Sequence, residues 1–207
     1  MPLRSEIERV FEGNAFKRPL FYSYPGGLRF ELSVGDTAID QFLLAIKKAG
    51  QVCADIFSVE QPFIACLRMR CLPSISAHRK VLRELAAAGI RIPRNRNAWL
   101  ELVPSGERFE ETIEEFWVNI AFEVEVSAIQ PLLWCALAKD FSSIRPRPAC
   151  DIYLFELKKG VMIFPYDDRG MDVVGPNHTL LAELYGRYYH YLLDYDRLSM
   201  EATFGAL

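Results

Sequence analysis

Apolar and polar residues alternate along several stretches of the chain, a pattern that predicts β-strands. The clearest stretch is 116–126, where every second residue from Phe116 is apolar and the residues between include Trp117, Asn119 and two glutamates. We expect one face of this strand to lie in the core and the other to be at least half solvated. The same pattern predicts strands over 28–32, 63–72, 99–103, 152–157, 161–166 and 171–174.

Apolar residues spaced three and four apart predict helices between these strands. Helices are expected over 5–13, 36–57, 76–89 and 127–139, and a long final helix should begin near Asn177. No internal repeat or flexible linker divides the 207 residues, so we expect a single domain over 1–207. Strands of antiparallel type interleaved with helices predict an α+β fold, a mainly antiparallel sheet with helices packed on one face and a long C-terminal helix.

Composition and charge exclude several classes of protein. Hydrophobic residues make up 51% of the chain and charged residues 25%, which is too apolar for a disordered protein. The net charge of −3 argues against nucleic-acid binding, and no stretch approaches the roughly 20 apolar residues that a membrane span needs. The first residues alternate in charge without an apolar segment, so we expect no signal peptide and a cytoplasmic location.

The residues that usually hold metals or cofactors are not arranged to do so. The five cysteines lack CxxC spacing and lie mostly among apolar residues, as reduced thiols do in cytosolic proteins. The three histidines are far apart, and none has a second ligand at metal-binding spacing. P-loop, GxGxxG, GxSxG and HExxH motifs are missing from the sequence. We expect no disulfide, no metal and no cofactor, and no catalytic residue can be named.

Two charged motifs near the C-terminus are the strongest candidates for a site. They comprise Asp167, Asp168, Arg169 and Asp172 in the first motif, and Asp194, Asp196 and Arg197 in the second. Neighbouring carboxylates can share a proton or hold a cation, which suits acid–base chemistry. Because Asp and Gly also favour turns, and ion pairs can join two elements, a structural role explains the same residues. We expect Arg169 or Arg197 to hydrogen-bond an aspartate of the other motif.

The charge of the chain changes sign near its middle. From Arg68 to Arg96, eight basic residues stand against one acid, whereas from Glu101 to Glu125 eight acids stand against one base. Alternation within the strand 63–72 places Arg68 and Arg70 on the face opposite Met69. The two charged blocks either form solvated faces that partly neutralise each other, or the acidic one steers a basic partner. The residues proposed to bind such a partner are Glu110, Glu111, Glu114, Glu115 and Trp117.

The C-terminal part of the chain resembles a known family. The segments Tyr166-Asp-Asp-Arg-Gly-Met-Asp172 and Leu193-Asp-Tyr-Asp-Arg197, in this order and at this separation, are similar to an uncharacterised bacterial family, domain of unknown function 3885. This signature region covers about 150–204, and Leu28-Arg-Phe-Glu-Leu32 extends the likeness toward the N-terminus. The resemblance implies a small bacterial cytoplasmic protein and no known activity or cofactor. By analogy alone, proteins of this style serve as immunity proteins beside toxin genes.

These observations favour a binding protein over an enzyme. We expect a non-enzymatic protein-binding module, an immunity-type inhibitor of a bacterial toxin domain, with a basic partner and with no nucleic acid or membrane bound. The alternative is a small hydrolase or nucleotide-handling enzyme that uses Asp167, Asp168 and Asp172. A structural protein without a dedicated partner surface is a third interpretation.

Overall fold

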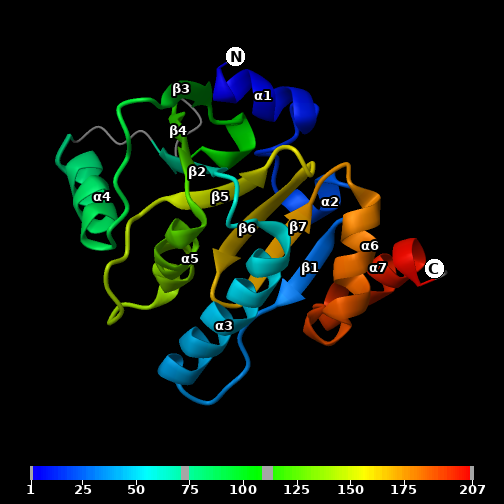
Figure 1. Ribbon diagram of the computed structural model, residues 1–207. Coiled ribbons are helices and arrows are strands. Elements are labelled where there is room, and N and C mark those ends of the chain that lie inside the picture. The colour runs from blue at the N-terminus through cyan, green and yellow to red at the C-terminus, as the bar shows by residue number, and fades with distance from the viewer. Residues whose placement is uncertain (1, 71–74, 109–113, 206–207) are drawn as a thin grey trace.

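An antiparallel sheet forms the centre of the molecule (Figure 1). The computed structural model describes residues 2–70, 75–108 and 114–205. Within this part of the chain the sheet has seven strands, and each predicted strand is present there with ends that differ by two residues at most. Residues 71 and 72 of the predicted strand 63–72 lie outside the described residues. The spatial order is β1 (Leu28–Glu31), β7 (Gly170–Val174), β6 (Val161–Asp167), β5 (Asp151–Glu156), β2 (Phe63–Arg70), β4 (Phe116–Val124) and β3 (Asn97–Leu102). The predicted α+β class is confirmed.

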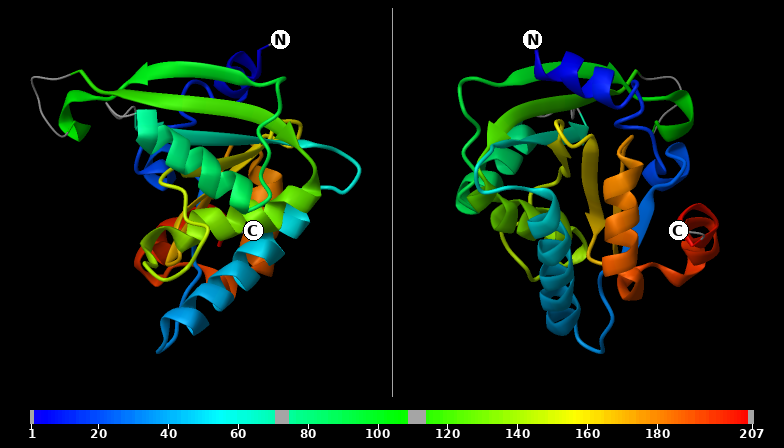
Figure 2. Two further views of the ribbon diagram at one scale, coloured as in Figure 1. Left: turned by 90° about the vertical axis from the view of Figure 1, so that its left-hand side faces the viewer. Right: turned by 45° about the vertical axis from the view of Figure 1, so that its right-hand side comes forward.

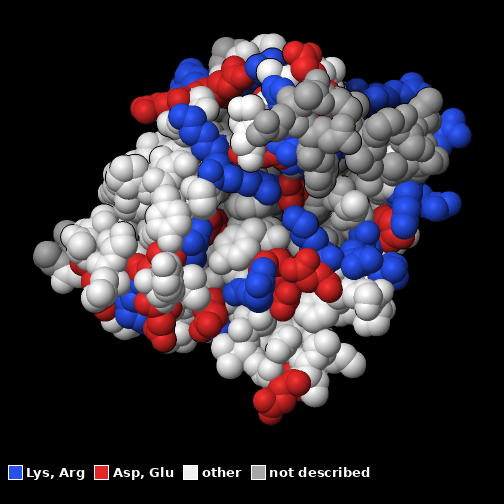
Figure 3. All heavy atoms as spheres, turned by 180° about the vertical axis from the view of Figure 1, so that it is seen from behind, with Lys and Arg blue, Asp and Glu red and all other residues white. Residues whose placement is uncertain are grey.

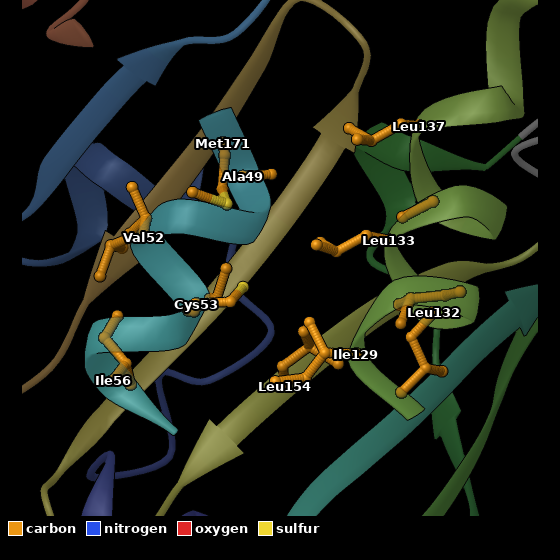
Figure 4. Packing of buried hydrophobic residues seen from close by; sticks show 14 of the residues in the cluster. Ala49, Val52, Cys53, Ile56, Ile129, Leu132, Leu133, Leu137, Leu154 and Met171 are labelled. Atoms are coloured by element: carbon orange, nitrogen blue, oxygen red, sulfur yellow. The ribbon is translucent and has the colours of Figure 1, made fainter. Parts of the chain in front are cut away.

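Helices cover the first face of the sheet. They include α3 (Ala38–Ile56), α4 (Ile75–Ala87), α5 (Ile129–Leu137) and α6 (His178–Arg187). Figure 4 shows Cys53 of α3 and Leu133 of α5 pointing toward Leu154 and Met171 of the sheet, and all four are fully buried. The apolar residues of α3 and α5 recur at helical spacing, so each helix buries one apolar face in the larger hydrophobic core, which lies between these helices and the sheet.

The second face is covered by the N-terminal part of the chain, where Ile7 of α1 (Leu3–Val10), Phe11 and Leu20 of α2 (Leu20–Ser23) are buried. They pack on Tyr153 and neighbouring strand residues, and the two views of Figure 2 show α1 lying along the β3 end of the sheet. Helices therefore lie on both faces.

This cover overturns the expectation that one face of β4 is at least half solvated. Trp117, Asn119 and Ala121, predicted to lie on the solvated face, are buried, whereas Phe116 and Val118 on the other face are only partly buried. Alternation identified the two faces correctly. It did not reveal which face is more deeply covered, because the covering residues lie about 100 positions earlier in the chain.

The C-terminal helical segment begins at His178 with an Asn177 cap, as predicted, but it is not one long helix. After Arg187 the chain makes two single 3-10 turns, and α7 (Arg197–Phe204) follows. The break has a tertiary cause, since Leu192 pairs with Phe30 and the amide of Leu193 donates to the carbonyl of Arg29 over 2.9 Å. Pairing with the edge strand β1 draws the backbone out of the helix.

Four thiols are present in the described part of the chain, at Cys53, Cys66, Cys135 and Cys150, and all are buried and unpaired. Burial raises the pKa of the Cys135 thiol to about 12 and that of the other three further, which makes them poor nucleophiles. Among the described residues no helix is both long and apolar enough to cross a membrane.

Candidate functional site

Arg29 joins the two predicted charged motifs. It lies opposite Asp172 in the β1–β7 register, and its Nε and Nη2 donate to the two carboxylate oxygens of Asp172 over 2.8 and 3.1 Å. Its Nη1 donates to Asp196 over 3.0 Å. The guanidinium also lies over the ring of Tyr22, whose hydroxyl donates to Asp196 over 2.7 Å. We call these four residues the Arg29 cluster.

The two motifs are connected, but the prediction that Arg169 or Arg197 makes the connection is wrong. Arg169 donates to Asp167 of its own motif, and Arg197 donates to Asp194 of its own motif over 2.8 Å. Arg169 and Arg197 follow their acids by only two and three residues, so local turns pair them first. The long-range link is made by Arg29, which lies between two apolar residues of β1 and belongs to neither motif.

Burial and pairing act against each other in the Arg29 cluster. Burial alone lowers the pKa of Arg29, but the carboxylates of Asp172 and Asp196 outweigh it and raise that pKa. Burial raises the pKa of Asp172, and the bonds from Arg29 offset part of this effect. Asp168 accepts a hydrogen bond from Ser33, so each buried aspartate of the first motif has a partner. This arrangement favours the structural interpretation of the two motifs.

A second polar region crosses β3, β4, β2 and β5 on the second face. The strand register places Arg68 between Asn119 of β4 and Asp151 of β5, and Trp117 between Glu101 of β3 and Arg70 of β2. As predicted, Arg68 and Arg70 share one face, since Met69 belongs to the core on the other. From the N-terminal cover, the ring of Phe16 lies 4.9 Å from the guanidinium carbon of Arg68, and the guanidinium carbon of Arg18 lies 5.8 Å from the indole of Trp117. Beside these contacts a large cavity opens at this end of the strands.

This cavity has a volume of about 1040 Å³ and a strongly basic lining. Its charged lining residues are Arg18, Arg68, Arg70, Lys80, Lys139 and Arg147 as bases, and Glu84, Glu107 and Asp151 as acids. We call it the basic cleft. Figure 3 shows the corresponding face of the molecule, where Lys and Arg side chains gather around a hollow. The apolar part of the lining includes Met69, Val81 and Pro148.

Trp117 forms part of the wall of the basic cleft, beneath arginine side chains. The guanidinium carbons of Arg68 and Arg70 each lie 4.8 Å from the indole ring, and that of Arg18 lies 5.8 Å away. The residue is only 7% exposed. The structure therefore places Trp117, one of the residues predicted to bind a partner, as a covered residue with three guanidiniums over its ring.

Asp151 ties two of these cations together. Its Oδ1 accepts from Lys139 over 2.7 Å, and its Oδ2 accepts from Arg18. Arg18 also donates to the Tyr153 hydroxyl over 3.2 Å. Burial raises the pKa of Tyr153 to about 12, although the neighbouring Arg18 lowers it in part, so this phenol is a hydrogen-bonding group rather than a base near neutral pH.

Some charged and polar groups of the cleft lack an ion-pair or hydrogen-bond partner in the described part of the chain. Lys80 has no carboxylate partner there, and within the described residues the Arg147 guanidinium donates a single hydrogen bond, to the carbonyl of Lys139 over 3.2 Å. The Nε of Arg68 and the Nε1 of Trp117 are buried without a hydrogen-bond partner among the described residues. A buried N–H without an acceptor is costly, so these two donors are unsatisfied groups within residues that line the cleft.

The acidic residues expected to bind a basic partner are dispersed. Glu115 pairs with Arg70, whereas Glu114 is exposed, and Glu110 and Glu111 lie outside the described residues. Glu101, in the same block, receives two hydrogen bonds from Arg68, of 2.6 and 3.2 Å. The basic and acidic blocks therefore neutralise each other in part, by pairing across β2, β3 and β4.

Sequence reasoning missed most of the basic cleft. Arg18, Lys139 and Arg147 come from three separate loops or helix ends and share no spacing. The one available signal was the pair Arg68 and Arg70, two arginines on a single face of a strand that is otherwise apolar. In the described residues, no group of three or more His, Cys, Asp or Glu side chains could hold a metal ion.

The comparisons with known proteins support the family and leave the activity open. No curated protein and no solved structure matches the chain. A family model does match, and it extends from residue 3 to residue 196, which includes β1, the basic cleft and both aspartates of the Arg29 cluster. The chain therefore belongs to the family described as Domain of unknown function (DUF3885).

Proposed function

We propose that the protein is a non-enzymatic protein-binding module that receives an acidic segment of its partner in the basic cleft. The observation that carries this proposal is the convergence of six cations from separate parts of the chain on one cavity, whose described lining residues include only three acids. Arginine forks and lysines in a concave site attract carboxylates and orient them. The apolar lining provides area for the aliphatic part of the bound segment.

The expected charge of the partner is thereby reversed. Two acids of the block that first suggested a basic partner form ion pairs with Arg68 and Arg70. The positive charges of Lys80 and Arg147, in contrast, are not neutralised by the described part of the chain. If the partner is a bacterial toxin domain, as the immunity-type interpretation proposes, it should present acidic residues to this cleft. The proposal places the protein in the cytoplasm and assigns it no cofactor.

The first test reverses the two unneutralised cations. The double variant Lys80→Glu/Arg147→Glu should bind a peptide of about six alternating glutamate and alanine residues about 10-fold or more weakly than the wild type in low salt. Each reversal removes one attraction and adds one repulsion, each worth up to about 1 kcal/mol. Calorimetric titration measures the affinity. The control Lys47→Glu makes the charge change of one such reversal on an exposed residue of α3 that does not line the cleft. If the double variant binds the peptide as tightly as the wild type does, the proposal is refuted.

The second test uses a variant that should bind the peptide more tightly than the wild type does. Asp151→Asn removes a carboxylate that competes with the ligand for Arg18 and Lys139. It should therefore tighten peptide binding about 2- to 5-fold, the equivalent of up to about 1 kcal/mol from one partly exposed charge pair. The same titration at rising salt should reduce this gain, because exposed charges are screened over about 10 Å at 0.1 M ionic strength. Weaker binding by the variant would contradict the assigned role of Asp151.

A further inference from the structure

We infer that the partner binds as an extended acidic segment that crosses the basic cleft and continues into the adjoining cavity. This inference rests on the proposed function and specifies the form in which the partner is bound. The adjoining cavity, here called the side cavity, has a volume of about 660 Å³ and lies between α1, β3 and the loop that precedes α2.

The two cavities share a wall. Arg18, Arg68, Glu107 and Trp117 line both of them, so among the described residues no further layer separates one cavity from the other. A groove divided only by side chains suits a chain that passes over them better than it suits a compact ligand, which would fill one cavity alone.

The side cavity continues the basic character of the cleft. Arg4, Lys17, Arg18 and Arg68 line it as cations, against Glu8, Glu101 and Glu107. Arg4 and Arg68 are already paired with Glu8 and Glu101. Lys17 is exposed and has no ion pair recorded among the described residues, so its charge is available to a ligand. Lys17 in the side cavity thus corresponds to Lys80 in the basic cleft.

Polypeptide fits this groove better than single-stranded nucleic acid does. Nucleic-acid grooves combine positive charge with aromatic faces on which bases stack. Here the indole of Trp117 is buried under three guanidiniums, and Trp99 lies against the guanidinium of Arg4 and the ring of Phe16. Neither ring is free for stacking, whereas acids along the groove provide acceptors for backbone amides. The groove therefore favours an acidic peptide.

The deciding experiment uses two peptides of alternating glutamate and alanine. One has about six residues and spans one cavity, and the other has about twelve and extends to roughly 40 Å, enough to span both. Lys17→Glu should weaken binding of the long peptide about 5-fold and change that of the short peptide less than about 2-fold. Lys80→Glu should weaken binding of both, and the control Lys47→Glu should weaken neither. Circular dichroism would establish that each variant is folded.

The outcomes separate this inference from the proposed function. If the long peptide responds to Lys80→Glu but not to Lys17→Glu, the extended mode is wrong and the basic cleft alone binds the ligand. If the long peptide responds to neither variant, the proposed function fails as well. A thymidine oligonucleotide of twelve nucleotides that binds more tightly than the long peptide at the same salt would overturn the assignment of a polypeptide partner.

Discussion

Replacing Arg29 with methionine should lower the free energy of unfolding by about 3–5 kcal/mol. The substitution keeps much of the aliphatic volume but leaves two buried carboxylates, Asp172 and Asp196, without their cation. Asp172 is almost completely buried, and water cannot replace the two hydrogen bonds that it loses. Urea unfolding followed by circular dichroism measures the change.

Two comparisons make this expectation specific. Arg169→Met breaks an ion pair whose arginine side chain is 75% exposed, so it should cost less than about 1 kcal/mol. The double variant Arg29→Met/Asp172→Asn should be less destabilised than the sum of its single variants, because a neutral amide replaces one unpaired charge. If Arg29→Met and Arg169→Met unfold at the same urea concentration, Arg29 is not the link between the motifs.

Gly175→Ala should also be strongly destabilising, by about 2–6 kcal/mol. A Cβ at this position would lie 2.1 Å from the carbonyl oxygen of Gly160, in the turn between β5 and β6. The backbone of Gly175 has φ +151°, which side chains rarely adopt. Backbone strain and overpacking each cost about 1–3 kcal/mol. The turn can relieve the contact only if the β6 edge of the hairpin moves.

Gly89→Ala is the matched control, because Gly89 also has a positive φ, of +82°, but no atom within 4 Å of the added Cβ. It should show only the cost of a left-handed backbone, about 1–2 kcal/mol. Comparing the thermal unfolding of the two variants separates the cost of backbone strain from the cost of the steric clash with Gly160. Equal losses at both positions would mean that the contact with Gly160 is relieved at no cost.

The Arg29 cluster and the basic cleft divide the charged residues of this protein into two kinds. In the cluster, each described carboxylate has a cation or donor, and its removal should affect stability. In the cleft, Lys80 and Arg147 lack such partners in the described chain, and their reversal should affect binding while the fold persists. Measuring stability and peptide affinity on the same variants therefore tests both assignments.

Local patterns in the sequence were sufficient to predict the strands, the start of α6 and the fold class. Strand alternation identified β4 and the two faces of β2, because side-chain direction in a strand depends only on position. Asn177 identified the start of α6, since an Asn cap satisfies an amide three residues ahead. Gly89 ends α4 for an equally local reason, its positive φ.

Tertiary structure decided the features that depend on distant residues. The end of α6 is determined by pairing with β1, and the burial of Trp117 by the guanidiniums of Arg18, Arg68 and Arg70 that lie over its ring. Arg29 became the partner of Asp172 because β1 and β7 are neighbours in the sheet, which no spacing along the chain reveals. The basic cleft has the same origin. Its cations are scattered from Arg18 to Arg147, and only the packing of loops at the ends of β2, β4 and β5 brings their charges into one cavity.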